Sequence, residues 1–252
     1  MWYHEIDGFL YLNLSSRPER KADMEKLLKQ DLVLPLTKVQ RIPAVPTTKG
    51  YDGCTQSHLK AINHAIQHRW KYLALFEDDF SLHTTPQTFH RRMEEAWQHL
   101  DGNFDVLYLA MTPIRLEDTE IKNFHRVKGA LAMPAIIVPQ HYFLPLKHIY
   151  EEALKKDQPH DLITQLHQPN SKWYGFYPPI ARQKPGFSDI EKKVVDYGYL
   201  EVQGQMLPEK KRVVVKPKTT TKHVIVDSGH MPQQLLHTLW YTIDLSRITK
   251  NT

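Results

Sequence analysis

The sequence of 252 residues has a single cysteine, Cys54, so no disulfide bond can form within the chain. One thiol also excludes a zinc site that is built from several thiolates. Such sparse use of cysteine fits a reducing compartment best.

An N-terminal leader and long apolar runs are lacking as well. The chain opens with Met-Trp-Tyr-His-Glu-Ile-Asp, without the basic stretch and apolar run of a secretory signal. The longest apolar candidate, residues 131–138, contains a proline and is far shorter than the ~20 residues that cross a bilayer as a helix. We therefore expect a cytoplasmic protein.

Strong charge of one sign and glycine-rich nucleotide motifs are also missing. The net charge of +5, from 33 basic and 28 acidic residues, is a mild excess that does not indicate a nucleic-acid partner. No Gly-x-Gly-x-x-Gly motif and no Walker lysine loop occurs, so dinucleotide and P-loop chemistry have no support. Basic residues gather only near the C-terminus, at 210–212, 216, 218 and 222, which allows peripheral membrane contact there.

What is present is an alternation of apolar segments with helical patterns. Residues 8–14 form an apolar run of strand length, and the Ser-Ser-x-Pro that follows favours a helix over 18–29. Further strand-like segments lie at 33–42, 72–76, 106–110 and 135–138, and further helical patterns lie from Thr55 to about 70, at 89–100 and at 144–156. With 41% hydrophobic residues to fill a core, this order predicts an α/β sandwich around a mixed, mostly parallel sheet.

Three consecutive acids, Glu77, Asp78 and Asp79, follow the apolar strand at 72–76. Carboxylates at the end of a buried strand repel one another and are costly to desolvate unless a cation compensates them. Side chains two positions apart on an extended segment share a side, so Glu77 and Asp79 could together hold Mg²⁺ or Mn²⁺. Taken alone, however, three such acids are more often an exposed turn that merely ends a strand.

Other segments accompany the acids in a fixed order. Asn13-Leu-Ser-Ser-Arg-Pro-Glu-Arg20 follows the first strand, Gly53-Cys-Thr-Gln-Ser-His58 precedes the acids, and Phe187-Ser-Asp-Ile190 comes late. In order and spacing these segments resemble glycosyltransferase family 25, which contains lipooligosaccharide galactosyltransferases and collagen hydroxylysine galactosyltransferases. The resemblance covers about residues 8–190.

The resemblance implies a GT-A-like, Rossmann-like α/β/α sandwich over residues 1–190, with residues 191–252 as a small C-terminal appendage packed on it. It implies a Mn²⁺ or Mg²⁺ ion held by Glu77 and Asp79 and a UDP-hexose donor that carries galactose or glucose. The acceptor would be a hydroxyl of a glycan or glycoprotein, and transfer would invert the anomeric centre. The chain looks closer to bacterial or virus-encoded members than to the luminal collagen enzymes, which carry a signal peptide.

Carried over by position, the resemblance assigns the donor site to Asn13, Arg17, Arg20, Ala44, Gly53, Ser57, His58 and Asp78. Arg17 is the preferred phosphate ligand, although a solvated arginine at a helix start would look the same in sequence. Ser57 and His58 would lie near the sugar or the diphosphate, or would instead cap or pack the following helix. Cys54 is expected to be a buried thiol. His223 and His230 are remoter candidates for completing the cation's ligands.

Inversion in a single step needs a carboxylate that takes the proton from the acceptor hydroxyl. Asp161 and Asp189 are the candidates, and Asp161 is preferred. The alternative for Asp161 is a helix cap ahead of Leu162. Two other functions also fit the sequence: a catalytically inactive nucleotide-sugar or glycan-binding module, and a basic interaction protein whose lysine-rich tail engages nucleic acid or membrane.

Overall fold

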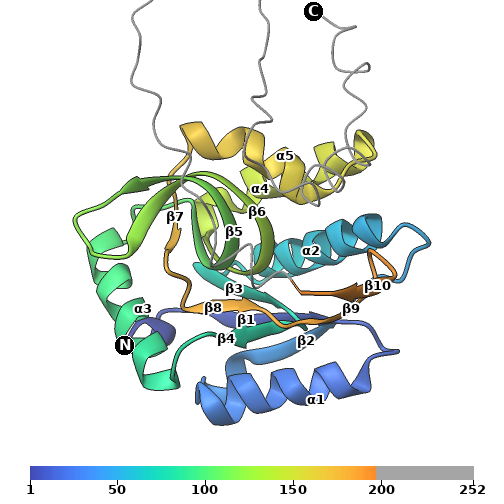
Figure 1. The fold of residues 1–252 in the computed structure, drawn as a ribbon, viewed down its shortest axis with the longest axis horizontal. Helices are drawn as coiled ribbons and strands as arrows, with labels where there is room; N and C mark the ends of the chain where they lie inside the picture. Colours follow the sequence, from blue (N-terminus) through green and yellow to red (C-terminus); the bar gives the residue numbers. More distant parts are fainter. Residues whose placement is uncertain (197–252) are drawn as a thin grey trace, which may run out of the picture. The chain divides into compact units, whose positions relative to one another are not determined.

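A computed structural model describes residues 1–196, which belong to one unit of the chain, Met1–Leu207. The central sheet contains β1 (Gly8–Asn13), β2 (Val39–Pro43), β3 (Tyr72–Glu77), β5 (Val106–Asp118), β6 (Phe124–Pro139) and β7 (Trp173–Phe176). Its strand order is β2-β1-β3-β6-β5-β7 (Figure 1). β1 is parallel to β2 and β3, β5 is parallel to β7, and β6 is antiparallel to all of its neighbours. Only β6 is reversed among these strands, which confirms the predicted mixed, mostly parallel sheet.

Helices cover both faces of the sheet. They are α1 (Pro18–Lys26), α2 (Gly50–Gln67), α3 (Pro86–Leu100), α4 (Gln140–Lys155) and α5 (His160–His167). Two small sheets pair β4 (Phe80–Leu82) with β8 (Ala181–Gln183), and β9 (Gly186–Ser188) with β10 (Lys193–Val195). Short turns of helix lie at Trp2–His4, Leu27–Asp31, Leu36–Lys38 and Gln168–Asn170.

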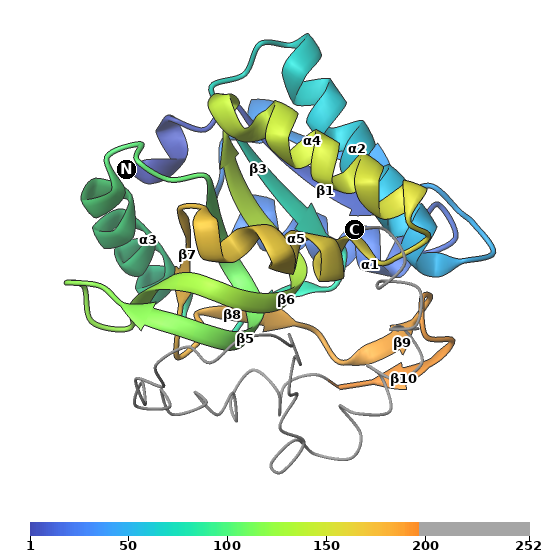
Figure 2. The ribbon, with the colours of Figure 1, turned by 90° about the horizontal axis from the view of Figure 1, so that it is seen from above.

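Alternating side chains of the central strands feed two hydrophobic cores. In β1, Phe9 and Tyr11 pack with residues of α1 and α3, while Leu10 and Leu12 pack with residues of α2 and α4. The same division continues in β3, and Figures 1 and 2 show the helices on the two sides of the sheet. Because both faces are buried, these strands are apolar at nearly every position before their last residue, which explains the continuous runs in the sequence.

Several elements differ from the sequence prediction in their extent, and β2 begins at Val39 rather than at residue 33. α2 begins at Gly50 rather than Thr55, because its first turn contains glycines, which disguise a helix start. β5 and β6 are much longer than the predicted 106–110 and 135–138 and form a hairpin that reaches Asp118. The outer part of β5 is half-exposed, and its pairing with β6 contains several register shifts, so it lacks the regular apolar pattern of the inner part.

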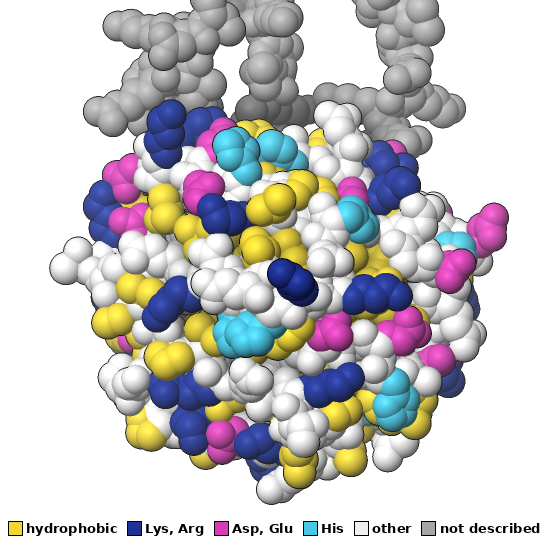
Figure 3. Space-filling view, turned by 180° about the vertical axis from the view of Figure 1, so that it is seen from behind, with side chains coloured by type: hydrophobic (Ala, Val, Ile, Leu, Met, Phe, Trp, Pro, Cys, Tyr) yellow, Lys and Arg dark blue, Asp and Glu magenta, His cyan; other side chains and the backbone are white. Residues whose placement is uncertain are grey.

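The predicted appendage, residues 191–252, lies outside the described residues except for 191–196. Within that short stretch, β10 pairs with β9 across the predicted boundary at residue 190. The basic residues at 210–222 and the histidines His223 and His230 also lie outside the described residues. No helix within residues 1–196 is long and apolar enough to span a membrane. On the face shown in Figure 3, basic and acidic side chains are interspersed, as on an ordinary solvated surface.

Candidate functional site

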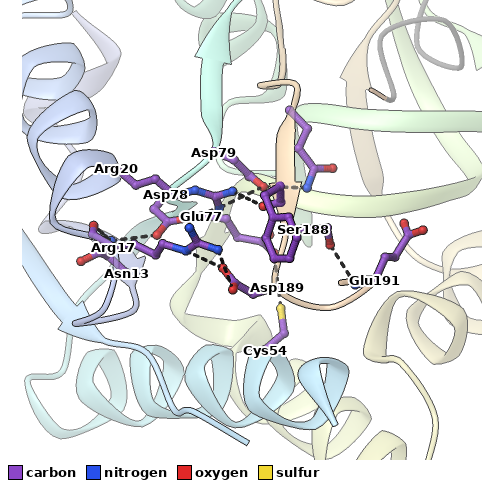
Figure 4. A network of polar contacts seen from close by, with 12 residues as sticks. Asn13, Arg17, Arg20, Cys54, Glu77, Asp78, Asp79, Ser188, Asp189 and Glu191 are labelled. Carbon is purple, nitrogen blue, oxygen red and sulfur yellow. Dashed lines mark hydrogen bonds and ion pairs between the residues drawn. The ribbon is translucent and has the colours of Figure 1, made fainter. Parts of the chain in front are cut away.

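The candidate site lies at the edge of the sheet where β1, β2 and β3 end (Figure 4). Asn13 is the last residue of β1 and Glu77 is the last residue of β3. Parallel strands end at the same edge, and ligands of such sheets bind there. The first segment of the family resemblance and the acidic motif, far apart in sequence, therefore lie side by side.

Asp78 faces the start of α1. Its Oδ1 accepts a hydrogen bond from Arg20 Nη1 at 3.0 Å, and its Oδ2 accepts one from Asn13 Nδ2 at 2.8 Å. Asn13 is buried and is held in turn by Arg41, whose Nε donates to Asn13 Oδ1 at 2.9 Å. Three predicted donor-site residues, Asn13, Arg20 and Asp78, thus form one hydrogen-bonded group.

Asp79 is largely buried and one of its oxygens lacks a partner. Its Oδ2 accepts a hydrogen bond from Gln183 Nε2 at 2.8 Å, and Arg20 Nη1 lies 3.9 Å from the same oxygen. Among residues 1–196, its buried Oδ1 has no hydrogen-bond partner. Burial, followed by the charge of Glu77, raises the pKa of Asp79 to about 7. A bound cation would offset the cost of this unpartnered oxygen.

Arg17 and Asp189 form a two-pronged ion pair at the same edge. Arg17 Nε donates to Asp189 Oδ2 at 3.0 Å and Arg17 Nη2 donates to Asp189 Oδ1 at 2.8 Å. These hydrogen bonds hold the pKa of Asp189 below its usual value. The backbone oxygen of Phe187 accepts a further hydrogen bond from Arg20, so two arginines attach the β9 segment to the start of α1.

Unlike Asp78, which contacts Arg20, Glu77 contacts residues of α2. Its Oε1 lies 3.0 Å from His58 Nε2 and 3.7 Å from Cys54 Sγ, and Figure 4 shows Cys54 on α2 with its contact to Glu77. Burial, followed by the charge of Asp78, raises the pKa of Glu77 to about 8. Burial also lowers the pKa of His58 to about 3, so this imidazole is neutral. His58 therefore contacts the acidic motif directly, through its hydrogen bond with Glu77.

Asp161 lies in the first turn of α5, and its side chain does not cap that helix. The N-cap is Pro159, and Asp161 Oδ2 accepts a hydrogen bond from the backbone N–H of Ala132 at 3.3 Å. Ala132 adopts a left-handed conformation (φ 57°) within β6, which is uncommon for a residue with a side chain. The charge of Asp161 also contributes to the raised pKa of Glu77 and of Cys54.

Three other predicted donor-site residues have structural roles. Ser57 is buried; its hydroxyl donates to the Gly53 backbone oxygen at 2.6 Å and accepts from the Val45 backbone N–H at 2.8 Å. The backbone N–H of Ala44 donates to the Asn13 backbone oxygen at 3.0 Å. Ser57, Gly53 and Ala44 therefore fix the loop after β2 against α2 and the end of β1, and the hydrogen bonds of Ser57 are those of a packed helix residue.

Gly53 has no space for a side chain. A Cβ atom there would lie 2.3 Å from the Val45 backbone oxygen and 2.8 Å from Thr47 Oγ1. We predict that Gly53→Ala destabilises the fold by about 1–2 kcal/mol, because overpacking outweighs the gain of about 1 kcal/mol from helix propensity. Gly129→Ala is the matched control, since its Cβ would meet neighbours at an ordinary 3.6 Å. Urea unfolding of both variants checks this, and equal stabilities would contradict it.

The residues at this edge fit a divalent cation. Asp79 offers an unpartnered carboxylate oxygen, and a second carboxyl group, that of Glu77, lies close enough to raise its pKa. Hard cations such as Mg²⁺ and Mn²⁺ prefer carboxylate ligands and bridge them to phosphate oxygens. The arginines beside the acids would complement the remaining phosphate charge.

Some residues of the site were not predicted from the sequence. Arg41 and Gln183 hold Asn13 and Asp79, and His160 lies beside the His58 ring with a centroid distance of 4.6 Å. His160 and Gln183 lie in segments that share the family resemblance, but no pattern gives them a role, and none marks Arg41; strand pairing and helix packing bring these residues to the site. Cys54 and His58 do carry a signal, since residues four apart on a helix share a face.

No family model matches the sequence, and no curated protein matches it either. Among solved structures, mannose-1-phosphate geranyltransferase from Thermus thermophilus is similar with a TM-score of 0.42 and 8% identity, over 70% of this chain and 73% of that chain. UDP-glucose pyrophosphorylase complexed with UDP-glucose is similar with a TM-score of 0.41 and 9% identity, over 71% of this chain and 91% of that chain. Similarities of this size assign no function. The resemblance to glycosyltransferase family 25 rests on the sequence segments alone.

Proposed function

We propose that this protein is a metal-dependent, inverting glycosyltransferase that moves a hexose, galactose or glucose, from a UDP-sugar to a hydroxyl of a glycan or glycoprotein. The observation that carries the proposal is the meeting of carboxylates and arginines at one edge of the sheet. Asp79 has an unpartnered buried oxygen there, and Arg17 and Arg20 lie at the start of α1 beside it. A nucleotide diphosphate needs both kinds of group, since a cation and guanidinium groups together neutralise its charge.

In this proposal Asp79 and Glu77 hold Mn²⁺ or Mg²⁺. When bound, the ion stabilises the charge that develops on the departing diphosphate. Asp78 keeps Arg20 oriented through the 3.0 Å hydrogen bond described above. Arg17 binds the diphosphate by exchanging Asp189 for phosphate oxygens, because carboxylate and phosphate groups both match the two-pronged geometry of a guanidinium group.

Asp161 is the proposed base and takes the proton of the acceptor hydroxyl while the bond between the sugar and the diphosphate breaks. Asp189 is the second candidate. The hydrogen bonds from Arg17 lower the pKa of Asp189, which makes that carboxylate a weaker proton acceptor as long as the pair persists. Asp161 is free of such a pairing with arginine among the ion pairs of residues 1–196.

A donor-hydrolysis assay tests the proposal without knowledge of the acceptor. The full-length protein is incubated with UDP-galactose, UDP-glucose and, as a control, GDP-mannose, with Mn²⁺ or with a chelator. We expect slow UDP release from one UDP-hexose that requires the metal, and no release of GDP. The absence of UDP release from every donor, together with the absence of Mn²⁺-dependent UDP binding by calorimetry, would refute the proposal.

The second candidate, a catalytically inactive binding module, predicts a different pair of results. Such a module would bind UDP in the presence of Mn²⁺ and release none from any donor, because binding alone does not lower the barrier of the chemical step. The same calorimetry and hydrolysis measurements therefore separate the two candidates.

A further inference from the structure

A second group of possible metal-ligand atoms includes Glu77 of the acidic motif and side chains of α2 and α5. Cys54 and His58 come from one face of α2, Glu77 from the end of β3, and His160 from the start of α5. One ligand atom from each residue lies within 4.8 Å of those of all the others. In a tetrahedral site with bonds of about 2.0–2.3 Å, the ligand atoms of one thiolate and three nitrogen or oxygen ligands are about 3.3–3.7 Å apart. The separation of Glu77 Oε1 from Cys54 Sγ, 3.7 Å, matches the upper end of that spacing, and the separation from His58 Nε2, 3.0 Å, is slightly shorter.

His160 presents an unused nitrogen. It is 6% exposed, and its Nε2 has no hydrogen-bond partner within residues 1–196. Its Nδ1 lies 3.2 Å from Thr55 Oγ1, and that hydroxyl already donates its proton to the Tyr51 backbone oxygen at 2.8 Å. Nδ1 must therefore carry the proton and donate it to Thr55. This leaves a bare lone pair on Nε2, the state that a metal-binding imidazole requires.

His58 is also held by a hydroxyl group. Its Nδ1 lies 3.3 Å from the Tyr150 hydroxyl, and its Nε2 lies 3.0 Å from Glu77 Oε1. A contact of one ring nitrogen with a hydroxyl group orients an imidazole as in metal-binding histidines, with the other nitrogen turned toward the ion.

We propose that Cys54, His58, Glu77 and His160 bind one zinc ion, or a chemically similar divalent transition-metal ion, in a closed site that joins α2, β3 and α5. One thiolate, two imidazoles and one carboxylate favour such an ion over Mg²⁺ or Ca²⁺. Binding releases the thiol proton and any proton on Glu77, and two anionic ligands then neutralise the charge of the ion. Because all four positions are filled by protein, the site is structural.

This site shares Glu77 and His58 with the predicted donor site and does not depend on the proposed transfer. Glu77 would face the buried ion with Oε1, the oxygen that contacts His58 and Cys54, while Oε2 of Glu77 and the Asp79 carboxylate remain for the donor's cation. The ion would then fix the end of β3 and so position the acids that follow it. A zinc site with a single cysteine also agrees with the exclusion of multi-thiolate sites.

Metal analysis of the full-length protein tests the proposal. The protein is expressed with added zinc, dialysed against a weak chelator and analysed by mass spectrometry for metals, and it is also reconstituted with Co²⁺. We expect one metal ion per chain and, with cobalt, an absorption band from thiolate coordination. Cys54→Ser should abolish that band, and His160→Gln should lose the metal. His125→Gln, at a buried histidine outside the group, should retain both.

A wild-type protein that takes up neither zinc nor cobalt, or Cys54→Ser and His160→Gln variants that keep a full equivalent, would overturn the proposal. If a variant fails to fold, as circular dichroism would show, the cobalt spectrum of the wild-type protein decides alone. A wild-type protein that takes up neither zinc nor cobalt but still releases UDP from a UDP-sugar in the presence of Mn²⁺ would refute only this site. A zinc-containing protein that neither binds UDP nor releases it would refute only the proposed function.

Discussion

Asp79→Asn should lower metal-dependent UDP release from the donor by about 100- to 1,000-fold. A cation that stabilises a departing diphosphate contributes several kcal/mol to the transition state, and each 1.36 kcal/mol is a factor of ten in rate. Asparagine keeps an oxygen for the hydrogen bond from Gln183, which Asp79 accepts at 2.8 Å, but removes the charge that holds the ion. The fold should therefore survive while the cation is lost.

The matched control is Asp118→Asn, which removes the same charge at the far end of β5, where the side chain is 87% exposed. Its UDP release should equal that of the wild-type protein. Initial rates are measured at saturating donor over a range of Mn²⁺ concentrations, with circular dichroism as the check of folding. Turnover that is indifferent both to Asp79→Asn and to a chelator would contradict the assignment of the cation site.

The parts of the fold that the sequence predicts well are those that are buried on both sides. β1 and β3 are apolar at nearly every position because helices cover both faces, so a continuous run marks each strand with little error in its ends. The outer part of β5 is half-exposed and pairs irregularly with β6, so its sequence lacks the pattern of a buried strand. Burial therefore decides which strands a pattern of apolar residues can reveal.

In the candidate site, the residues that the sequence predicts are those that lie in short segments. Asn13, Arg17 and Arg20 lie in one short segment, and a strand that ends beside β3 must bring that segment to the acids. Its remaining members depend on tertiary packing. Gln183 reaches Asp79 through the pairing of β8 with β4, and no spacing in the sequence announces that contact.

Ser57 and Asp189 lie in the segments expected from the sequence, but their hydrogen bonds differ from those that the proposed roles would suggest. Ser57 lies in the expected segment, but its hydroxyl is used by the loop before α2, which corresponds to the packing alternative that the sequence leaves open. Asp189 was expected as a candidate base, and it is the partner of Arg17 in this structure. Whether a carboxylate binds an arginine or a substrate depends on distances that a one-dimensional pattern does not contain.

The metal-free protein should lose stability as the pH rises, and Asp79→Asn should remove much of that loss. The folded-state pKa of Asp79 is raised to about 7, so the folded chain holds this proton more tightly than the unfolded chain does. Stability falls with rising pH wherever the folded state binds more protons. The contribution of Asp79 is therefore fully present below about pH 4 and is lost as the pH rises through about 7.

The comparison of the wild-type protein with Asp79→Asn tests this group. The raised pKa of Glu77 acts in the same direction and is present in both proteins. The lowered pKa values of His58 and His160 act in the opposite direction, with stability lost as the pH falls, but they are common to both proteins. In the presence of a chelator the two should unfold at similar temperatures near pH 4. Near pH 8 the variant should be more stable by about 3 kcal/mol, or roughly 10 °C in Tm.

Added Mn²⁺ should reverse that order near pH 8, because a bound cation stabilises the ionised carboxylate of the wild-type protein and finds no such ligand in the variant. Differential scanning calorimetry across pH 4–8, with chelator and with Mn²⁺, measures both differences. If Tm changed with pH in the same way for the two proteins, with chelator and with Mn²⁺, then Asp79 would have neither a raised pKa nor a role as a cation ligand.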